Sequence, residues 1–418
     1  MVNRKTFANL ILFFIIFNTF FNNLFVEFQL IVFKNIFISN LIFKLFILVL
    51  IFINVFVSKK INIKKNSIEA KLLCITFLIL IILPFIILIN NGNIKSYSNI
   101  IGQSYYIYLL SFFFLFSYKY INIKRLITQI KYIGLLNAFM CIAQYVTDSL
   151  IFLYTEYPDG TPIFNSTFFN NNGHTVRSVG LCSSGFDCGV ILIFTLLLTI
   201  NNFKKTKRFS QKIIFSIEVL ILAFSIYTTK SRNIYLFAAY CISFLILYSI
   251  IKYKNVKNLF SKAVPILIIF VFIIIYFSGS LLDGSQNATH LFSVNTILIR
   301  FTEWEDAIKY FNSHPISSIF GFGLSQTVGI VTDNIFLDVI YTFGFIGLFI
   351  FSFFWIQLTK EMYKLIELDN VYKYLYVYVS SIFIVGVGNL ISQSFGFLCI
   401  LLPVLLICSK YYLSDFIF

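Results

Sequence analysis

The sequence is poor in charge, and acids are its scarcest charged residues. Charged residues make up 12% of the 418 positions, and only 17 Asp and Glu stand against 32 Lys and Arg. Apolar residues make up 59% and aromatic residues 19%, which is more apolar surface than a soluble core can bury. The composition therefore predicts an integral membrane protein.

Histidine and cysteine are also scarce, and their spacing argues against two common kinds of site. The three histidines, His174, His290 and His314, lack paired spacing such as HxxxH and have no carboxylate cluster beside them, which disfavours zinc. Most of the seven cysteines lie in apolar runs, and Cys182 and Cys188 are too far apart on one predicted helix for a disulfide. We predict no metal, no cofactor and no disulfide framework.

Long apolar runs fill the chain instead. Runs of about 17 residues or more can span a bilayer as helices, and they predict an all-α, polytopic bundle of about twelve transmembrane helices in one membrane domain, residues 1–418. The predicted spans are 7–25, 36–57, 72–89, 100–117, 126–147, 179–200, 213–228, 234–251, 264–282, 333–355, 374–390 and 395–409. The first run lacks a small-residue cleavage site, so we expect it to be retained.

The excess of bases sets the expected topology. When the connections are assigned alternately to two sides, the large majority of Lys and Arg fall on one side, which the positive-inside rule makes cytoplasmic. Both termini are then cytoplasmic, and the charge does not indicate nucleic-acid binding. Two longer connections, 148–178 and 283–332, become extracytoplasmic loops, and long loops in a compact bundle are often functional.

Three arginines lie on the outer side, where the topology bias disfavours them. Arg177 and Arg232 precede spans that begin at the outer face, and Arg300 lies in the second loop. A helix N-terminus carries partial positive charge, so an Arg placed there is unfavourable unless an anion binds beside it. This pattern predicts a phosphate or diphosphate site. The alternative is that each Arg reaches lipid phosphates or pairs with a nearby acid such as Asp187.

The tenth predicted span has an unusually polar start. Asp333 is either its N-cap, a role that Asn334 could share, or a general base close to a bound substrate. Asp338 lies one turn after Asn334 on the same face, which extends a polar seam into the helix. Gly344 and Gly347 are predicted to let a neighbouring helix approach closely.

Two further features concern packing. Trp304, Ile308 and Phe311 recur at helical spacing, so 300–312 is predicted to be an amphipathic helix whose aromatic edge lies on the membrane surface. Glu218 lies in the middle of the seventh span, where an acid is costly, and we expect it to have a structural partner.

The order of these motifs over roughly residues 175–350 resembles that of the O-antigen polymerases (Wzy-type) and the related O-antigen ligases. Arg232 followed by Leu236 is similar to a ligase pattern at an outer helix start. Asn334, Gly344 and Gly347 match a second ligase pattern in which the position of Asp333 is a histidine.

Two weaker patterns agree with the resemblance. Arg177-Ser-Val-Gly-Leu is similar to the Arg and Gly-Leu stretch that precedes a span in the family. Further along, the family order of Arg, Trp, Pro and Gly-x-Gly is found at Arg300, Trp304, Pro315 and Gly321-Phe-Gly323.

The resemblance implies a GT-C-like bundle that performs metal-independent, inverting glycosyl transfer on the periplasmic face of the inner membrane. The donor would be an oligosaccharide on undecaprenyl diphosphate, with Arg177, Arg232 and Arg300 binding the diphosphate. Asp333, beside Asn334, would replace the ligase histidine as general base; the alternative is a polymerase whose base lies elsewhere, with His314 or Asp338 as substitutes. The second loop would cover the glycan, and Trp304, His314 and Asp338 are its candidate substrate contacts.

The missing histidine favours a polymerase over a ligase that transfers the glycan to lipid A-core. A flippase for the same lipid-linked oligosaccharide is the alternative from another class, although transporters keep charges near the midplane and often show repeats, and no repeat is visible here. A chain-length regulator is an expected protein partner, and no nucleic acid is expected.

Overall fold

The computed structural model describes residues 123–149, 151, 177–182, 184–251, 294–322, 334–366 and 370–386, together with short pieces between residues 9 and 50. These residues are helical or lie in turns and connections, and none of them forms a strand. The chain groups into two compact units: a first unit of residues 1–73, 105–235 and 394–418, and a second unit of residues 74–104 and 236–393.

Four described helices are long and apolar enough to cross a membrane. They are α6 (Ile123–Thr147), α7 (Gly185–Lys205), α8 (Phe209–Thr228) and α9 (Arg232–Ile250). The chain is a membrane protein, as its composition predicted. Six predicted spans, 7–25, 36–57, 72–89, 100–117, 264–282 and 395–409, lie wholly or mostly outside the described residues, so the number twelve stays a prediction.

The predicted start of the sixth span, at residue 179, was wrong, because α7 begins at Gly185. Residues 177–182 precede it as non-helical chain. Gly180 has φ +60°, in the left-handed region that favours glycine, and a Cβ there would lie 2.6 Å from Asn137 Oδ1. The side chains of α6 therefore hold this segment out of the helix.

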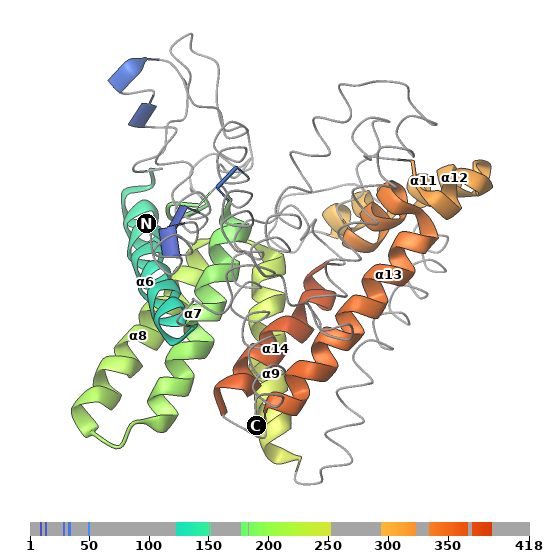
Figure 1. Cartoon of the computed structure of the whole chain (residues 1–418). Helices are drawn as coiled ribbons and strands as arrows, with labels where there is room; N and C mark the ends of the chain where they lie inside the picture. The colour runs from blue at the N-terminus through green and yellow to red at the C-terminus, as the bar shows by residue number, and fades with distance from the viewer. Residues whose placement is uncertain are drawn as a thin grey trace. The chain divides into compact units, whose positions relative to one another are not determined.

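Helices α6, α7 and α8 pack side by side in the first unit (Figure 1). Gly134 of α6 lets the side chain of Thr195 of α7 approach, since a Cβ at Gly134 would overlap Thr195 Oγ1. Ser225 Oγ of α8 donates to Ala138 O of α6 at 3.0 Å. Small and hydroxylated residues thus bring the helices close, as expected where lipid removes the hydrophobic drive between spans.

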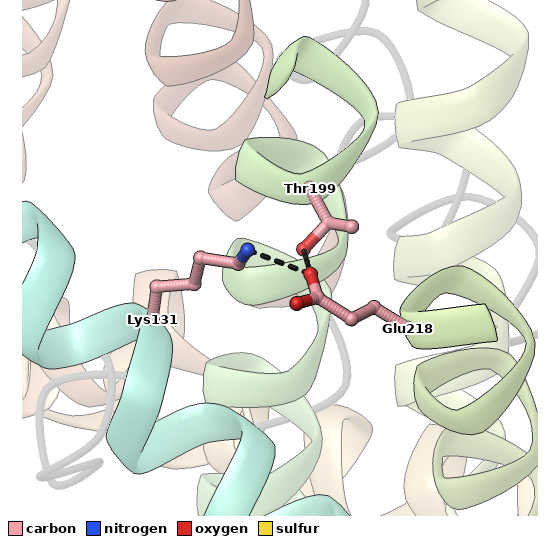
Figure 2. A network of polar contacts seen from close by, with 3 residues as sticks. All are labelled: Lys131, Thr199 and Glu218. Carbon is pink, nitrogen blue, oxygen red and sulfur yellow. Dashed lines mark hydrogen bonds and ion pairs between the residues drawn. The ribbon is translucent and has the colours of Figure 1, made fainter. Parts of the chain in front are cut away.

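A buried ion pair joins the three helices, as Figure 2 shows. Lys131 Nζ of α6 lies 2.6 Å from Glu218 Oε2 of α8, with the two side chains 11% and 19% exposed. Thr199 Oγ1 of α7 donates to the same carboxylate oxygen at 3.5 Å. The Lys131 ammonium also lies 4.8 Å from the Phe215 ring centroid. The prediction that Glu218 has a structural partner is confirmed, and the partner is Lys131.

In the second unit, the described helices other than α9 are α11 (Val294–Ser313), α12 (Pro315–Phe320), α13 (Ile335–Leu365) and α14 (Asn370–Val385). The predicted helix 300–312 lies within α11. Its apolar edge, however, packs in a buried cluster with Leu337 and Tyr341 of α13 instead of lying on a membrane surface. Ring contacts such as Phe237 with Tyr378, at 5.4 Å between centroids, join α9 to α14.

Helix α13 is kinked at Gly344, which has φ +70° and ψ −174°. A Cβ at Gly344 would overlap the carbonyl of Ile319 in α12, so the backbones of the two helices touch there and the predicted packing role of Gly344 is confirmed. A Cβ at Gly347 would instead meet Phe343 of α13 itself. The structure thus assigns the close approach of a neighbouring helix to Gly344, whereas Gly347 relieves crowding beside the kink.

Removing one member of the Lys131–Glu218 pair is expected to destabilise the protein, because the other charge is left buried. Breaking a buried pair costs on the order of 3–5 kcal/mol, whereas replacing both partners with apolar residues is often tolerated. Glu218→Leu should therefore lower the unfolding temperature of the detergent-purified protein, and Lys131→Leu combined with Glu218→Leu should restore much of it.

A matched control is the exposed pair of Lys309 and Glu305, 2.9 Å apart on α11 with side chains 66% and 44% exposed. Glu305→Gln should leave the unfolding temperature almost unchanged, since exposed pairs contribute little. The structural role of the buried pair is contradicted if Glu218→Leu unfolds at the wild-type temperature, or if the double variant is no more stable than the single one.

Candidate functional site

The first unit brings three cations to one end of its helices. Ser178 N donates to Thr228 O at 3.1 Å, which ties the segment before α7 to the end of α8. A Cβ at Gly185 would lie 3.3 Å from Thr229 O and 3.4 Å from Ser178 O, so the first residue of α7 lies at the same point. Arg177 precedes Ser178, Lys230 follows Thr229, and Arg232 begins α9. The local fold therefore gathers these three residues.

Arg177 has no hydrogen-bond or ion-pair partner in the described part of the chain. Its Nε is buried without a partner. Lys230 lies close enough to Arg177 for the two positive charges to repel each other. The alternative in which Arg177 pairs with a nearby acid therefore finds no support among the described residues.

Lys230 is the residue that the sequence reasoning missed. Burial lowers the pKa of Lys230; Asp148 opposes this shift, and Arg177 adds to it. Its ammonium lies 5.5 Å from the centroid of the Tyr145 ring of α6. The available signal was a cation on the outer side, two positions before Arg232 in the stretch Thr-Thr-Lys-Ser-Arg.

The backbone of Lys230 is also unusual. Its φ is +47°, in the left-handed region that non-glycine residues seldom adopt. It follows the C-cap Thr229 of α8, and this is the position at which helices most often use glycine. A lysine that bears this strain beside Arg177 suggests a role for its charge, because strained conformations concentrate at functional sites.

The start of α7 has its own cap, which changes part of the prediction. Ser184 Oγ accepts from Asp187 N at 3.1 Å and donates to Asp187 Oδ2 at 3.0 Å. Asp187 in the first turn already provides the negative charge that the helix dipole favours. Attraction for an anion at this end must therefore come mainly from the side-chain cations.

The polar start of α13 is centred on Asn334. Asn334 is the N-cap: its Oδ1 accepts from Phe336 N at 2.9 Å and from Leu337 N at 3.3 Å. The residue is fully buried, and its Nδ2 has no hydrogen-bond partner in the described part of the chain. Asp338 follows one turn later and is also buried, as the predicted polar seam requires. Asp333 lies outside the described residues, and its role as base stays a prediction.

The remaining predicted site residues belong to α11 and its end. Trp304 is 6% exposed and is part of the buried cluster against α13, so its proposed contact with a sugar stays a prediction. His314 is exposed: its ring stacks on Tyr310 at 4.5 Å, and its Nδ1 lies 2.9 Å from Ser313 Oγ. Arg300 lies within α11, and its side chain is outside the described part.

The two groups of residues belong to different units. Arg177, Lys230 and Arg232 are in the first unit, whereas the predicted residues of α11 and α13 are in the second. That both groups serve one reaction stays a prediction. Among the described residues, no group of three or more His, Cys, Asp or Glu could hold a metal ion.

Comparison with known families gives one match. The model of the O-antigen ligase family matches residues 217–352. The matched stretch is less than half of the chain, and over it the chain is similar to the O-antigen ligase family. The matched stretch begins within α8 and ends within α13, so it contains Lys230, Arg232 and Asn334, whereas Arg177 precedes it. No curated protein matches the chain significantly.

The family supplies what the fold alone does not. The match is consistent with an O-antigen polymerase or ligase and does not distinguish between the two. The resemblance to the O-antigen polymerases and ligases that the sequence suggested is thus confirmed.

Replacing Lys230 separates its charge from its strain. Lys230→Gly should keep or raise the unfolding temperature, because glycine adopts φ near +47° at little cost. Its free energy of unfolding should exceed that of Lys230→Ala by roughly 1 kcal/mol. Both variants should weaken binding of undecaprenyl diphosphate to the purified protein, since both remove the cation. Equal binding by the wild type and Lys230→Gly would show that the charge has no part in anion binding.

Proposed function

We propose that the protein is a polymerase that joins undecaprenyl-diphosphate-linked repeat units into a surface polysaccharide, on the outer face of the cytoplasmic membrane. The observation that carries the proposal is Arg177, which is partly buried beside Lys230 and has no hydrogen-bond or ion-pair partner among the described residues. Two neighbouring cations repel each other, and burial increases the cost. A bound diphosphate removes this cost, and a diphosphate is the leaving group of the proposed reaction.

The proposed chemistry is an inverting displacement without a metal. The acceptor hydroxyl oxygen attacks the anomeric carbon from the side opposite the diphosphate, the carbon–oxygen bond to the diphosphate breaks, and undecaprenyl diphosphate leaves with the bonding electrons. Arg177, Lys230 and Arg232 would stabilise the charge that develops on the leaving group, and Arg300 is a further candidate. Asp333 would accept the hydroxyl proton as general base.

Asn334 has two tasks in this proposal. Its Oδ1 caps α13, and its buried Nδ2, which has no partner among the described residues, would donate a hydrogen bond to an oxygen of the acceptor or donor sugar. Buried donors almost always have a partner in native proteins, so an unpaired one at a predicted site supports a ligand there. His314 and Asp338 remain candidates for the base if Asp333 does not serve.

Two alternatives remain. A ligase would use the same donor and differ in its acceptor; the position where the ligases have histidine is occupied by Asp333, which favours a polymerase. A flippase is favoured by one observation, the charged pair of Lys131 and Glu218 within predicted spans. The contacts of that pair with Thr199 and Phe215 favour a structural role instead.

The test is to delete the gene and examine the lipopolysaccharide ladder on a gel. Core carrying a single repeat unit is expected and indicates a lost polymerase. Bare core would indicate a ligase or flippase, and an unchanged ladder would overturn the whole proposal. In the complemented strain, Arg177→Ala should shorten the chains strongly, whereas Lys207→Ala, which removes an exposed cation from the turn between α7 and α8, should restore the full ladder.

The two roles of Asn334 can be separated by substitution. Asn334→Ser keeps an oxygen that can cap α13 but removes the amide donor. The free energy of unfolding should therefore change by about 1 kcal/mol or less. Chain length should nevertheless collapse. Asp333→Asn should give the same phenotype with normal protein level in the membrane. A full ladder from either variant removes that residue from the mechanism.

A further inference from the structure

Residues 178–182, which precede α7, are unusual because their backbone is not helical and yet each of their N–H groups is hydrogen-bonded. An exposed N–H or C=O group in an apolar surrounding is costly, so non-helical chain near the membrane has to find partners within the protein. Each N–H from residue 178 to residue 182 has one. Ser178 N donates to Thr228 O, Val179 N and Gly180 N to Gln144 Oε1, Leu181 N to Asn137 Oδ1, and Cys182 N to Val179 O.

Gln144 of α6 makes more of these contacts than any other described side chain. Its Oε1 accepts from Val179 N and Gly180 N, both at 3.0 Å. Its Nε2 donates to Gly180 O at 2.8 Å and to Ile151 O at 3.3 Å. A primary amide can donate two hydrogen bonds and accept two, so this fully buried side chain uses its whole capacity on backbone groups.

The same turn of α6 also contacts the second cation. Tyr145, next to Gln144, lies beneath the ammonium of Lys230. Tyr145 is itself fixed by edge contacts with Phe224 and Tyr227 of α8, at 5.8 and 6.4 Å between ring centroids. The last turns of α6 therefore touch both the segment that begins with Arg177 and the side chain of Lys230.

We infer that Gln144 is a positioning residue for Arg177: it fixes the backbone of residues 178–180 and thereby holds the guanidinium where the diphosphate binds. The inference rests on the proposed function. Without Gln144, Val179 and Gly180 would lose the acceptor of their N–H groups, and the segment would shift to find others. A displacement of about 1 Å of a binding group can cost about a hundredfold in rate.

The test is a double-mutant cycle on the full-length protein in detergent, with binding of undecaprenyl diphosphate as the measurement. Gln144→Leu keeps a similar volume and removes all four hydrogen bonds; we expect binding about tenfold weaker or more. Arg177→Ala should weaken it similarly, and the double variant should be no weaker than Arg177→Ala alone, because one interaction is lost in both. A merely structural role would instead give additive losses.

Gln129→Leu is the matched control, since Gln129 lies on the same helix with an exposed side chain. It should bind like the wild type. If Gln144→Leu does not accumulate, Gln144→Glu replaces it: the carboxylate still accepts from Val179 and Gly180 but repels Gly180 O and Ile151 O, so weaker binding is expected again. In either variant, binding at the wild-type level overturns the inference, as does additivity with Arg177→Ala.

The cycle also separates this inference from the proposed function. If Arg177→Ala binds undecaprenyl diphosphate as tightly as the wild type, the proposed site itself is wrong. If Arg177→Ala loses binding while Gln144→Leu and the wild type bind alike, the site stands and only the role of Gln144 is wrong.

Discussion

The demand that buried backbone groups be hydrogen-bonded decides how the first unit is built. In apolar surroundings a helix meets this demand internally, but residues 177–182 are not helical and depend on side chains of α6 and on the end of α8. Asn137 and Gln144 are two turns apart on one face of α6, and both are fully buried. The chain thus keeps polar side chains inside a bundle, and they hold the non-helical backbone that follows Arg177.

Buried charges also need partners, and the first unit treats its cations in two different ways. Lys131 and Glu218 neutralise each other inside the bundle, and Thr199 satisfies the carboxylate further. At the end of the unit, Arg177 has no such partner among the residues that the structure describes, and Lys230 adds a second positive charge beside it. The paired Lys131 stabilises the bundle, whereas Arg177, without a partner among the described residues, is suited to bind a ligand. This contrast is the strongest physical argument that an anion belongs beside Arg177.

Hydropathy predicted the described helices well, because a long apolar run in a membrane can satisfy its backbone hydrogen bonds internally only as a helix. It failed where side chains of one helix act on the backbone of another. The start of α7 was placed at 179 because Val179 and Leu181 are apolar, and nothing in a single run shows that Gln144 and Asn137 take up their N–H groups. The aromatic edge of α11 was likewise assigned to the membrane surface because its true partner, α13, is distant in sequence.

The site residues divide along the same line. Arg177 and Arg232 could be found from charge on the disfavoured side. Lys230 carries the same signal and was not singled out, and the strained backbone that distinguishes it is invisible in the sequence. At the start of α13 the sequence left both Asp333 and Asn334 as candidate N-caps, and in the structure the cap is Asn334. Its side-chain oxygen accepts hydrogen bonds from the helix, and its amide nitrogen has no partner among the described residues. Among the described residues, local rules are broken at the partnerless guanidinium of Arg177 and the strained Lys230 in the first unit, and at the unsatisfied amide of Asn334 in the second. Because proteins keep such violations mainly where function needs them, each of them favours a binding role over a structural accident.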